Sequence, residues 1–360
     1  MTELRVLIDA SNCKPGQGGI HTYVTSLADA LSHRGDLSVV VATSVPDAFH
    51  GAATVIELDP ATRTFERRLI WRERFLPGMC AREGADVLLV PVPEAPWRPV
   101  SCPVVTVLHD IGPLLLPHFY GRTRWLRYRI GLPHLVARSS AVVCVSEATR
   151  RGFVKAFPWV AQRVAVIGEA PQSLPPARSP ERNDLLYVGS LMPHKNVDVI
   201  LRAIAALGRR VDFRIVGPCT ASERQQLEER AAQLGVAESV SFEGFVSKDR
   251  LANLYAGTAA VVLPTLSEGF GLTAVEALAA GAPLIASDLP VLREACSRRP
   301  TYIASPTDER AWAGAIEAKL EARSAPAVAA PWEQSQTWSS VAAEFGQLFG
   351  QVCARQAVAA

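Results

Sequence analysis

Residues 259–288 read AAVVLPTLSEGFGLTAVEALAAGAPLIASD, and they contain three patterns in succession. A buried apolar run, AAVVLPTL, is followed by the glycine-rich loop SEGFG and by an amphipathic stretch that we expect to be a helix beginning at Thr273. The short apolar run PLIASD then predicts a second strand. Strand, helix and strand in this order are typical of a βαβ unit, whose parallel strands are covered by helices on both faces.

The same alternation extends in both directions along the chain. The strand-like runs LLYVGS, DFRIVG and SVSFEGF precede this unit, and each is followed by a longer amphipathic stretch. The first part of the chain repeats the scheme with longer insertions, from LRVLIDA to RVAVIG. Between the two parts, residues 171–183 begin with a run rich in proline and serine, which is typical of a semi-rigid linker. The pattern predicts an α/β protein with two doubly wound, Rossmann-like parallel-sheet domains, residues 1–170 and 184–335.

Composition and charge place the chain among well-packed globular proteins. Of its 360 residues 49% are apolar, and 37 Lys and Arg nearly balance 35 Asp and Glu, so nothing indicates a nucleic-acid partner. The seven cysteines never form a CxxC pair, so we expect reduced thiols in a cytoplasmic protein and no zinc site. No apolar run approaches the roughly 18 residues of a membrane span, and MTELRVLIDA is expected to be a first strand and not a signal peptide.

Arginines gather with aromatic residues in two segments of the first part, residues 63–75 and 120–129. Such a surface is suited to anionic lipid headgroups, which would place the protein peripherally on the inner face of the membrane, or to an anionic acceptor. A solvated helix face whose aromatic side chains belong to the core would have the same composition. Both interpretations stay open at this point.

Ligands of an open parallel sheet bind at the carboxyl ends of its strands, and several informative residues stand there. Gly18 and Gly19 open the first predicted helix, where glycine lets the backbone approach a phosphate, and a flexible turn is the alternative. His109 and Asp110 follow the strand PVVTVL; a neutral imidazole there can bind a sugar hydroxyl, and a structural pair is the alternative. Lys195 stands at the expected start of the helix after LLYVGS, where either a bound anion or simple exposure would explain a cation.

Two carboxylates flank the loop of the opening stretch. Glu268 lies in the loop and Glu276 about one turn into the helix, so both are expected to face one crevice beside free backbone N–H groups. The N–H groups and Lys195 would bind a diphosphate, and the carboxylates would accept hydrogen bonds from the hydroxyls of a ribose and a hexose. The pattern contains no metal-ligand cluster and no nucleophile-base pair, so we expect a site that needs neither metal nor cofactor.

Together these motifs resemble the retaining GT-B glycosyltransferases of family 4. The resemblance spans nearly the whole chain, through GQGGI, LHD, VSEAT, YVGSLMPHKN and SEGFGLTAVEALAAGAPLIASDLP, the last of which contains the E-x7-E motif. It implies two domains that face each other across a cleft and a carboxy-terminal helix at 336–353 that crosses back to the first domain. It also implies transfer of a hexose, mannose before others, from a nucleoside diphosphate sugar to a glycan, lipid-linked or small-molecule acceptor in polysaccharide biosynthesis.

The resemblance further implies roles for individual residues. His109 and Glu268 would act at the reaction centre, and Glu268 would contact the hydroxyls of the transferred sugar. Glu276 would bind the ribose hydroxyls and Lys195 the diphosphate. The remaining donor-binding positions would be Gly18, Gly19, Asp110, Gly189, Ser190, His194, Phe270, Gly271 and Leu272.

Some positions depart from the family pattern. His194 and Ser190 stand where the family commonly has basic residues, so fewer cations would meet the diphosphate. The stretch Gly168-Glu169-Ala170-Pro171 replaces the frequent Pro-Asn-Gly turn before the linker. Two other functions remain as alternatives: a nucleotide- or glycan-binding scaffold without turnover, and a nucleotide-sugar epimerase of the same fold.

Overall fold

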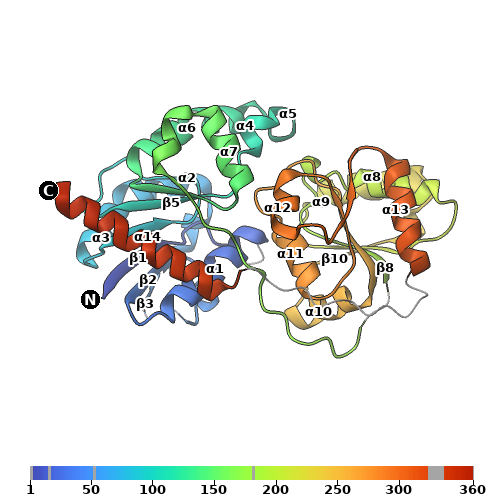
Figure 1. Cartoon of the computed structure of the whole chain (residues 1–360), viewed down its shortest axis with the longest axis horizontal. Helices are drawn as coiled ribbons and strands as arrows, with labels where there is room; N and C mark the ends of the chain where they lie inside the picture. The colour runs from blue at the N-terminus through green and yellow to red at the C-terminus, as the bar shows by residue number, and fades with distance from the viewer. Residues whose placement is uncertain (1–2, 15–17, 52–53, 181–182, 323–335, 360) are drawn as a thin grey trace. The chain divides into compact units, whose positions relative to one another are not determined.

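The computed structural model describes residues 3–14, 18–51, 54–180, 183–322 and 336–359 (Figure 1). The chain divides into two compact units. The first comprises Met1–Ala170 and Gln336–Ala360, and the second comprises Pro171–Ser335. Most of the segment expected to be a linker, residues 171–180, has no helix or strand and belongs to the second unit. The backbone N–H groups of Arg178 and Ser179 attach it there by donating to Asn253 Oδ1 at 2.9 and 3.1 Å.

In the first unit the described residues form a seven-stranded parallel sheet in the order β3-β2-β1-β4-β5-β6-β7. The chain winds outward from β1 to β3 and then returns to the other side of β1 with β4. The winding direction therefore reverses between β1 and β4. The strands are β1 (Leu4–Asp9), β2 (Leu37–Thr43), β3 (Thr54–Glu57), β4 (Val87–Val90), β5 (Val104–Leu108), β6 (Ala141–Cys144) and β7 (Val164–Val166). The helices are α1 (Gly19–Ser32), α2 (Phe65–Arg74), α3 (Leu76–Arg82), α4 (Gly112–Leu115), α5 (Pro117–Tyr120), α6 (Arg122–Arg138), α7 (Glu147–Ala156) and α14 (Trp338–Ala359).

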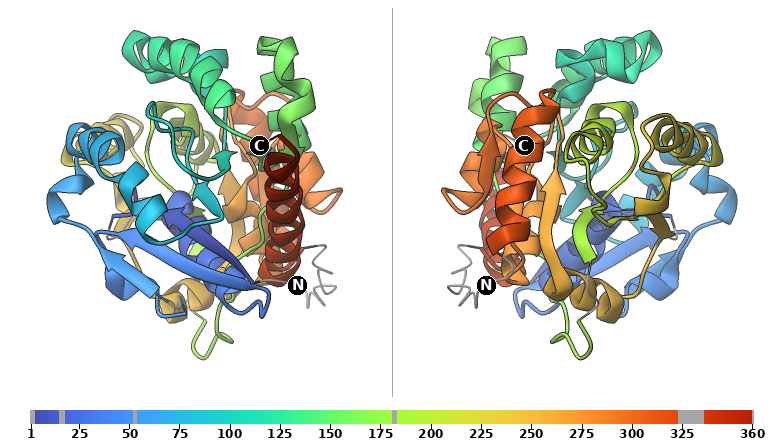
Figure 2. Two further views of the ribbon diagram at one scale, coloured as in Figure 1. Left: turned by 90° about the vertical axis from the view of Figure 1, so that its left-hand side faces the viewer. Right: turned by 90° about the vertical axis from the view of Figure 1, so that its right-hand side faces the viewer.

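Apolar side chains alternate along the strands and bury both faces of this sheet. Leu7 of β1 packs with Trp71 of α2 and Met79 of α3 in one core cluster. The neighbouring side chains Val6 and Ile8 are also buried and point to the opposite face, because successive side chains of a strand alternate. Figure 2 shows α14, in dark red, on the other side of the blue strands from the light-blue α2 and α3.

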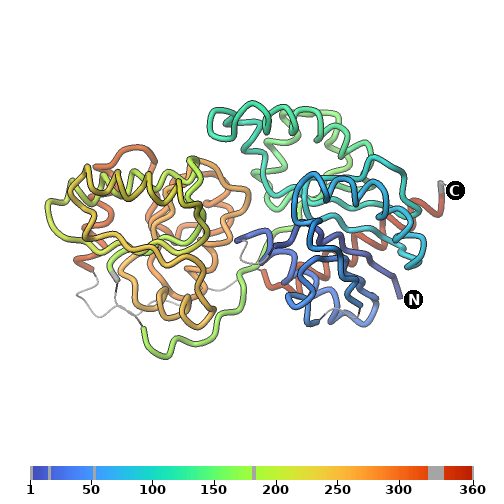
Figure 3. Tube along the Cα trace, turned by 180° about the vertical axis from the view of Figure 1, so that it is seen from behind, coloured from blue at the N-terminus to red at the C-terminus, as the bar shows by residue number. Residues whose placement is uncertain are grey.

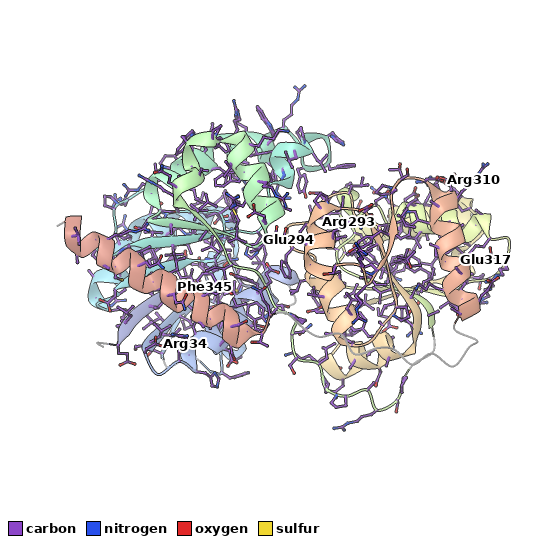
Figure 4. The ribbon with its side chains drawn as sticks, in the orientation of Figure 1. Arg34, Arg293, Glu294, Arg310, Glu317 and Phe345 are labelled. Carbon is purple, nitrogen blue, oxygen red and sulfur yellow. The ribbon has the colours of Figure 1, made fainter. Side chains whose placement is uncertain are left out.

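The last helix, α14, completes the first unit by packing against α1. Its apolar side chains Val341, Phe345 and Phe349 are fully buried. Gly346 lies so close to the Arg34 guanidinium that a Cβ at this glycine would come within 2.9 Å of Arg34 Cζ. Figure 3 shows the carboxy-terminal helix lying along the blue amino-terminal strands, and Figure 4 labels Phe345 on α14 and Arg34 in the turn that follows α1.

The described residues of the second unit form a six-stranded parallel sheet in the order β10-β9-β8-β11-β12-β13. Here the winding direction reverses between β8 and β11. The strands are β8 (Asn183–Val188), β9 (Phe213–Val216), β10 (Val240–Gly244), β11 (Thr258–Leu263), β12 (Leu284–Ser287) and β13 (Thr301–Ile303). The helices are α8 (Asp198–Ala206), α9 (Ala221–Gln233), α10 (Lys248–Gly257), α11 (Leu272–Ala279), α12 (Pro290–Cys296) and α13 (Glu309–Ala322).

The core of the second unit joins the sheet to α8 and α13. Tyr187 and Phe213 of the sheet pack with Ile200 of α8 and with Trp312 and Ile316 of α13, all of them fully buried. The predicted α/β class with two doubly wound parallel sheets is confirmed. Part of the predicted second domain, residues 323–335, lies outside the described residues. No helix in the described part of the chain is long and apolar enough to cross a membrane.

Two arginines of the first arginine-rich segment fit neither interpretation drawn from the sequence, because they are buried. Arg72 of α2 is fully buried, and its guanidinium donates to Asp9 Oδ2 at 2.7 Å and to Glu94 Oε2 at 2.6 Å. Arg68 also donates to Glu94 Oε2, at 3.4 Å. These two arginines therefore stabilise the first unit. The arginines of α6 are different, because that helix contains no acidic residue.

Candidate functional site

Lys195 and Glu268 form an ion pair where the winding of the second sheet reverses. Lys195 Nζ donates to Glu268 Oε1 at 2.5 Å, and the two side chains are 18% and 15% exposed. Lys195 comes from the loop after β8 and Glu268 from the loop after β11, and these strands are neighbours in the sheet. Ligands of open α/β sheets bind outside the carboxyl ends of strands at such a reversal. The structure thus places a cation and a carboxylate, partly exposed, where a ligand is expected.

Hydrogen bonds between the two loops hold this pair in position. The backbone N–H of Leu266 donates to the carbonyl oxygen of His194 at 2.8 Å. The hydroxyl of Thr265 lies 3.4 Å from the carbonyl oxygen of His194 and also donates, within its own loop, to the carbonyl oxygen of Ser267 at 2.8 Å. The side chain of His194 is buried, and His194 also takes part in an interaction within the described structure.

The expectation that a helix begins at Lys195 was wrong. Lys195 ends a short 3₁₀ turn, Pro193–Lys195, and α8 begins only at Asp198. The interruption is at Asn196, whose φ of 55° is left-handed and cannot continue a right-handed helix. Its side-chain N–H group donates to the carbonyl oxygens of Pro264 at 3.2 Å and Pro306 at 2.9 Å, so Asn196 also ties the lysine loop to the β11 loop. Asparagine is the common non-glycine choice for this conformation, so the sequence did contain the signal.

Glycine is required at two places in these loops. Gly271 has φ 93° and caps the amino end of α11, and a Cβ there would lie 2.4 Å from Leu292 Cδ2. Gly217, which follows β9, has φ 128°, and its Cβ would lie 2.4 Å from the carbonyl oxygen of Gly189. Tyr187 also supports the turn after β8, because its hydroxyl donates to the carbonyl oxygen of Ser190 at 2.6 Å.

The α11 residues differ in exposure. The helix begins at Leu272, one residue before the predicted start, and Glu276 lies about one turn inside it, as expected. Glu276 is buried. The pKa of Tyr255 is raised by the burial of that tyrosine and, to a smaller extent, by the charge of Glu276. Phe270 and Leu272 are half-buried, and Gly271 between them is buried.

In the first unit His109 follows β5 and is held on both ring nitrogens. Its Nδ1 lies 3.1 Å from Glu169 Oε1, and its Nε2 lies 2.9 Å from the carbonyl oxygen of Pro91. A carboxylate and a carbonyl oxygen only accept hydrogen bonds, so the geometry favours an imidazolium that donates on both sides over the neutral ring expected from the sequence. Burial acts to lower the pKa of His109, but the hydrogen bond and charge of Glu169, the hydrogen bond to Pro91 and the charge of Asp110 together raise the pKa above its ordinary value.

Aromatic rings enclose this histidine. The ring of Tyr23 meets that of His109 edge to face at 4.7 Å and that of Trp338 in the same way at 5.6 Å. Burial, followed by the charge of Glu169, raises the pKa of Tyr23 well above its ordinary value. The Tyr23 ring therefore connects His109, which follows β5, with α1 and α14, a contact that the sequence did not indicate.

The other predicted residues of the first unit surround the ends of β1 and β5. Asp110 Oδ1 accepts a hydrogen bond from the Gly112 N–H at 2.8 Å, at the start of α4. Gly18 is the N-cap of α1 and makes no side-chain cap, and no described atom would meet a Cβ at Gly18 or Gly19. Internal packing in the described part therefore does not demand these glycines. Gln17 and Gly16 of the same loop lie outside the described residues.

Within the described part of the chain no group of three or more His, Cys, Asp or Glu side chains is arranged to hold a metal ion. All nine predicted donor-site positions of the second unit lie in or beside the loops that follow β8 and β11, with Lys195 and Glu268 in direct contact.

Comparison with known families gives two matches that follow one another along the chain. Glycosyltransferase Family 4 matches residues 17–169, and Glycosyl transferases group 1 matches residues 173–333. The chain belongs to glycosyltransferase family 4. Membership of family 4 confirms the resemblance seen in the motifs.

Curated relatives in the family are similar over parts of their length. The O-antigen chain mannosyltransferase RfbU of Salmonella typhimurium is 28% identical over 212 residues, 58% of this chain and 59% of that protein. The D-inositol 3-phosphate glycosyltransferase of Nocardia farcinica is 31% identical over 212 residues, 53% of this chain and 47% of that protein. The chain thus spans about half the length of these family 4 relatives.

Solved structures share the GT-B fold over nearly the whole chain. Sucrose-phosphate synthase from Thermosynechococcus elongatus has a TM-score of 0.76 at 19% identity and covers 98% of this chain and 100% of its own. HepE from Anabaena, in complex with UDP and glucose, has a TM-score of 0.70 at 18% identity and covers 99% of both chains. The family 4 chain therefore has the fold predicted from its motifs.

Proposed function

We propose that the protein is a retaining glycosyltransferase that moves a hexose, mannose before others, from a nucleoside diphosphate sugar to a glycan, lipid-linked or small-molecule acceptor in the cytoplasm. The observation that carries this proposal is the Lys195–Glu268 pair at the carboxyl ends of β8 and β11. The relative named as an O-antigen chain mannosyltransferase supports mannose. The similar structures of HepE in complex with UDP and with UDP-glucose, and of starch synthase IV bound to ADP and acarbose, support a nucleotide sugar.

In the proposed reaction the bond between the anomeric carbon and the diphosphate oxygen breaks. The acceptor oxygen bonds to the same face of that carbon, and its proton passes to the departing diphosphate. Negative charge grows on the diphosphate while positive charge grows on the sugar ring, so groups that stabilise both lower the barrier. Lys195 would bind the diphosphate in place of Glu268, and Glu268 would then accept hydrogen bonds from the sugar hydroxyls.

The amino end of α11 would add to the stabilisation of the leaving group. Gly271 caps this helix without a side-chain hydrogen bond, and the free N–H groups of a helix start favour an anion. With Lys195 and this helix end next to the diphosphate, we expect transfer without a metal ion or cofactor.

The test is the thermal midpoint of unfolding with GDP, UDP, ADP, dTDP and their sugar conjugates, each with and without Mg²⁺. A nucleotide at about a hundred times its dissociation constant stabilises the native state by about 2.7 kcal/mol, which corresponds to several degrees. We expect one nucleotide family to raise the midpoint, with or without Mg²⁺, and Lys195→Ala to abolish the rise. Lys248→Ala, which removes an exposed lysine at the start of α10, is the matched control and should keep it.

Three results would count against the proposal. A midpoint that rises equally in Lys195→Ala and in the wild type would remove Lys195 from the donor site. Absence of any response to the four nucleotide families would instead favour the binding scaffold without turnover. Conversion of a nucleotide sugar without an acceptor would identify an epimerase.

A further inference from the structure

A cavity of about 670 Å³ lies in the first unit between α2, α6 and the loops that follow β1 and β4. Asn12 and Lys14 line it from the β1 loop, and Glu94 lines it from the β4 loop. Since the winding of this sheet reverses between β1 and β4, the cavity opens where an open α/β sheet binds its ligand. Figure 1 shows α2 and α6 on the first unit.

The inner end of the cavity offers a buried hydrogen-bond acceptor. Asn12 is only 8% exposed, and its side-chain oxygen has no hydrogen-bond partner among the described residues. A buried acceptor without a partner costs free energy, which a ligand hydroxyl would recover. The nearby carboxylate of Glu94 is already bound by Arg68 and Arg72. This end is therefore suited to a hydroxyl-bearing group such as a sugar.

The α6 side of the cavity is cationic. Arg124 and Arg127 line it, and within the described chain neither forms an ion pair with a carboxylate. Their guanidinium groups lie 5.6 Å from the centre of the Tyr120 ring and 4.6 Å from that of Phe65, so aromatic rings hold both cations in position. Arginines positioned in this way can each bind a phosphate by two parallel hydrogen bonds.

The outer wall is apolar and open to solvent. Leu126 and Ile130 of α6 are 51% and 57% exposed, and Trp97 is 58% exposed. The Trp97 ring is fixed by stacking on His134, with ring centres 3.5 Å apart and an angle of 14° between the planes. Exposed apolar side chains grouped in this way mark a surface that another apolar group covers. A free phosphate or a glycan alone would leave this wall uncovered.

We propose that this cavity binds the phosphorylated end of a lipid-linked acceptor. The hydroxyls of the acceptor lie at Asn12, its phosphate lies between Arg124 and Arg127, and the first part of its aliphatic chain covers Leu126 and Ile130. The inference rests on the proposed function, because it selects one of the three acceptor classes named there. It also accounts for the combination of cationic and exposed apolar side chains that line this cavity.

The experiment measures binding of dodecyl phosphate by titration calorimetry, with inorganic phosphate and the neutral dodecyl maltoside as separate probes, all below micelle-forming concentrations. Removing both arginines as Arg124→Gln with Arg127→Gln should weaken dodecyl phosphate binding about tenfold or more, because charge-assisted hydrogen bonds are lost. The matched control is Arg122→Gln with Arg129→Gln, on the same helix but outside the cavity. It removes the same charge and should leave the affinity nearly unchanged.

The apolar wall has its own matched pair of variants. Ile130→Ser changes a cavity side chain that is 57% exposed, and Ile70→Ser changes one on α2 that is 60% exposed and does not line the cavity. We expect Ile130→Ser to weaken binding of dodecyl phosphate without changing the response to inorganic phosphate. Ile70→Ser should change neither.

Several outcomes would overturn the proposal. Equal loss in both arginine pairs would mean diffuse attraction to a basic surface. Equal affinity for inorganic and dodecyl phosphate would mean a soluble phosphorylated acceptor, and equal affinity for dodecyl maltoside would mean a site without charge recognition. The nucleotide-dependent midpoint is measured on the same samples, so loss of that response with dodecyl phosphate binding intact would count against the proposed donor function and not against this site.

Discussion

Replacing Glu169 with Gln should change the protonation of His109. The carboxylate lies 3.1 Å from His109 Nδ1, and the only other polar contact of the ring in the described structure is the Pro91 carbonyl oxygen at 2.9 Å from Nε2. Gln keeps the size and a hydrogen-bonding oxygen but removes the charge. Among the charged groups that act on this ring, Asp110 then remains, and its effect on the pKa is smaller than that of Glu169.

The size of the effect follows from the contact. An opposite charge at this distance shifts a pKa by about one to three units, and each unit corresponds to about 1.4 kcal/mol. In the wild type Glu169, with smaller contributions from Pro91 and Asp110, offsets burial and holds the pKa of His109 above 6.5. In Glu169→Gln burial is the larger remaining influence, so we expect the pKa to fall below 6.5.

The two proteins should therefore differ in how their stability depends on pH. In the wild type the raised pKa contributes stability that is complete below the unfolded pKa and is lost as pH rises through the folded pKa. In the variant the lowered pKa reverses the sign, so this group reduces the free energy of unfolding as pH falls through 6.5. The difference in unfolding free energy between the two proteins is largest on the acidic side.

Nuclear magnetic resonance titration of the histidine rings between about pH 5 and 9 measures this directly. His109→Gln identifies the resonance. Asp29→Asn, which removes the exposed carboxylate beside His33, is the control and should leave the His109 titration unchanged. An identical His109 pKa in the wild type and Glu169→Gln would refute the reasoning.

Three further predictions follow from the two units. Arg72→Leu should lower the free energy of unfolding by about 3 to 5 kcal/mol in a denaturant titration, because it leaves the buried Asp9 carboxylate without its cation. Arg74→Leu, on the exposed side of α2, should cost little, and equal effects of the two substitutions would contradict the buried network. Glu268→Ala should lower glycosyl transfer by about a hundredfold or more with an unchanged thermal midpoint, and near-normal transfer would remove Glu268 from the reaction centre. Gly217→Ala should lower the free energy of unfolding of the second unit by about 1 to 3 kcal/mol. Gly208→Ala should lower it less, because Gly208 also has a positive φ but has open space for a Cβ. A larger loss in Gly208→Ala would contradict the clash between a Cβ at Gly217 and the carbonyl oxygen of Gly189.

Local patterns were enough to predict the parallel sheets and the loop that contains Glu268. The alternation of apolar runs and amphipathic stretches determines which face each element buries, so AAVVLPTL and LTAVEALAAG were recognised as strand and helix. The strand itself ends at Leu263, before the proline that could not continue its hydrogen bonding.

Contacts between distant segments were not predictable in the same way. Glu169 lies 60 residues from His109 and Arg72 lies 63 residues from Asp9. The first pair meets because the strand order places β7 and β5 on either side of β6, and the second because α2 packs over β1. No periodicity in a single sequence encodes that order. Glu169 had been noticed only as a departure from a family turn, and its charge partner emerged from the fold.

The packing of α14 on α1 has a consequence for synthesis. The first unit is assembled from two separate stretches of chain, Met1–Ala170 and Gln336–Ala360, whereas the second is one continuous stretch, Pro171–Ser335. During synthesis on a ribosome, the side chains of α1 that α14 covers therefore stay exposed until the whole second unit has been made. Phe345 and Phe349 reach them last, so the second unit can finish folding while the first is still incomplete.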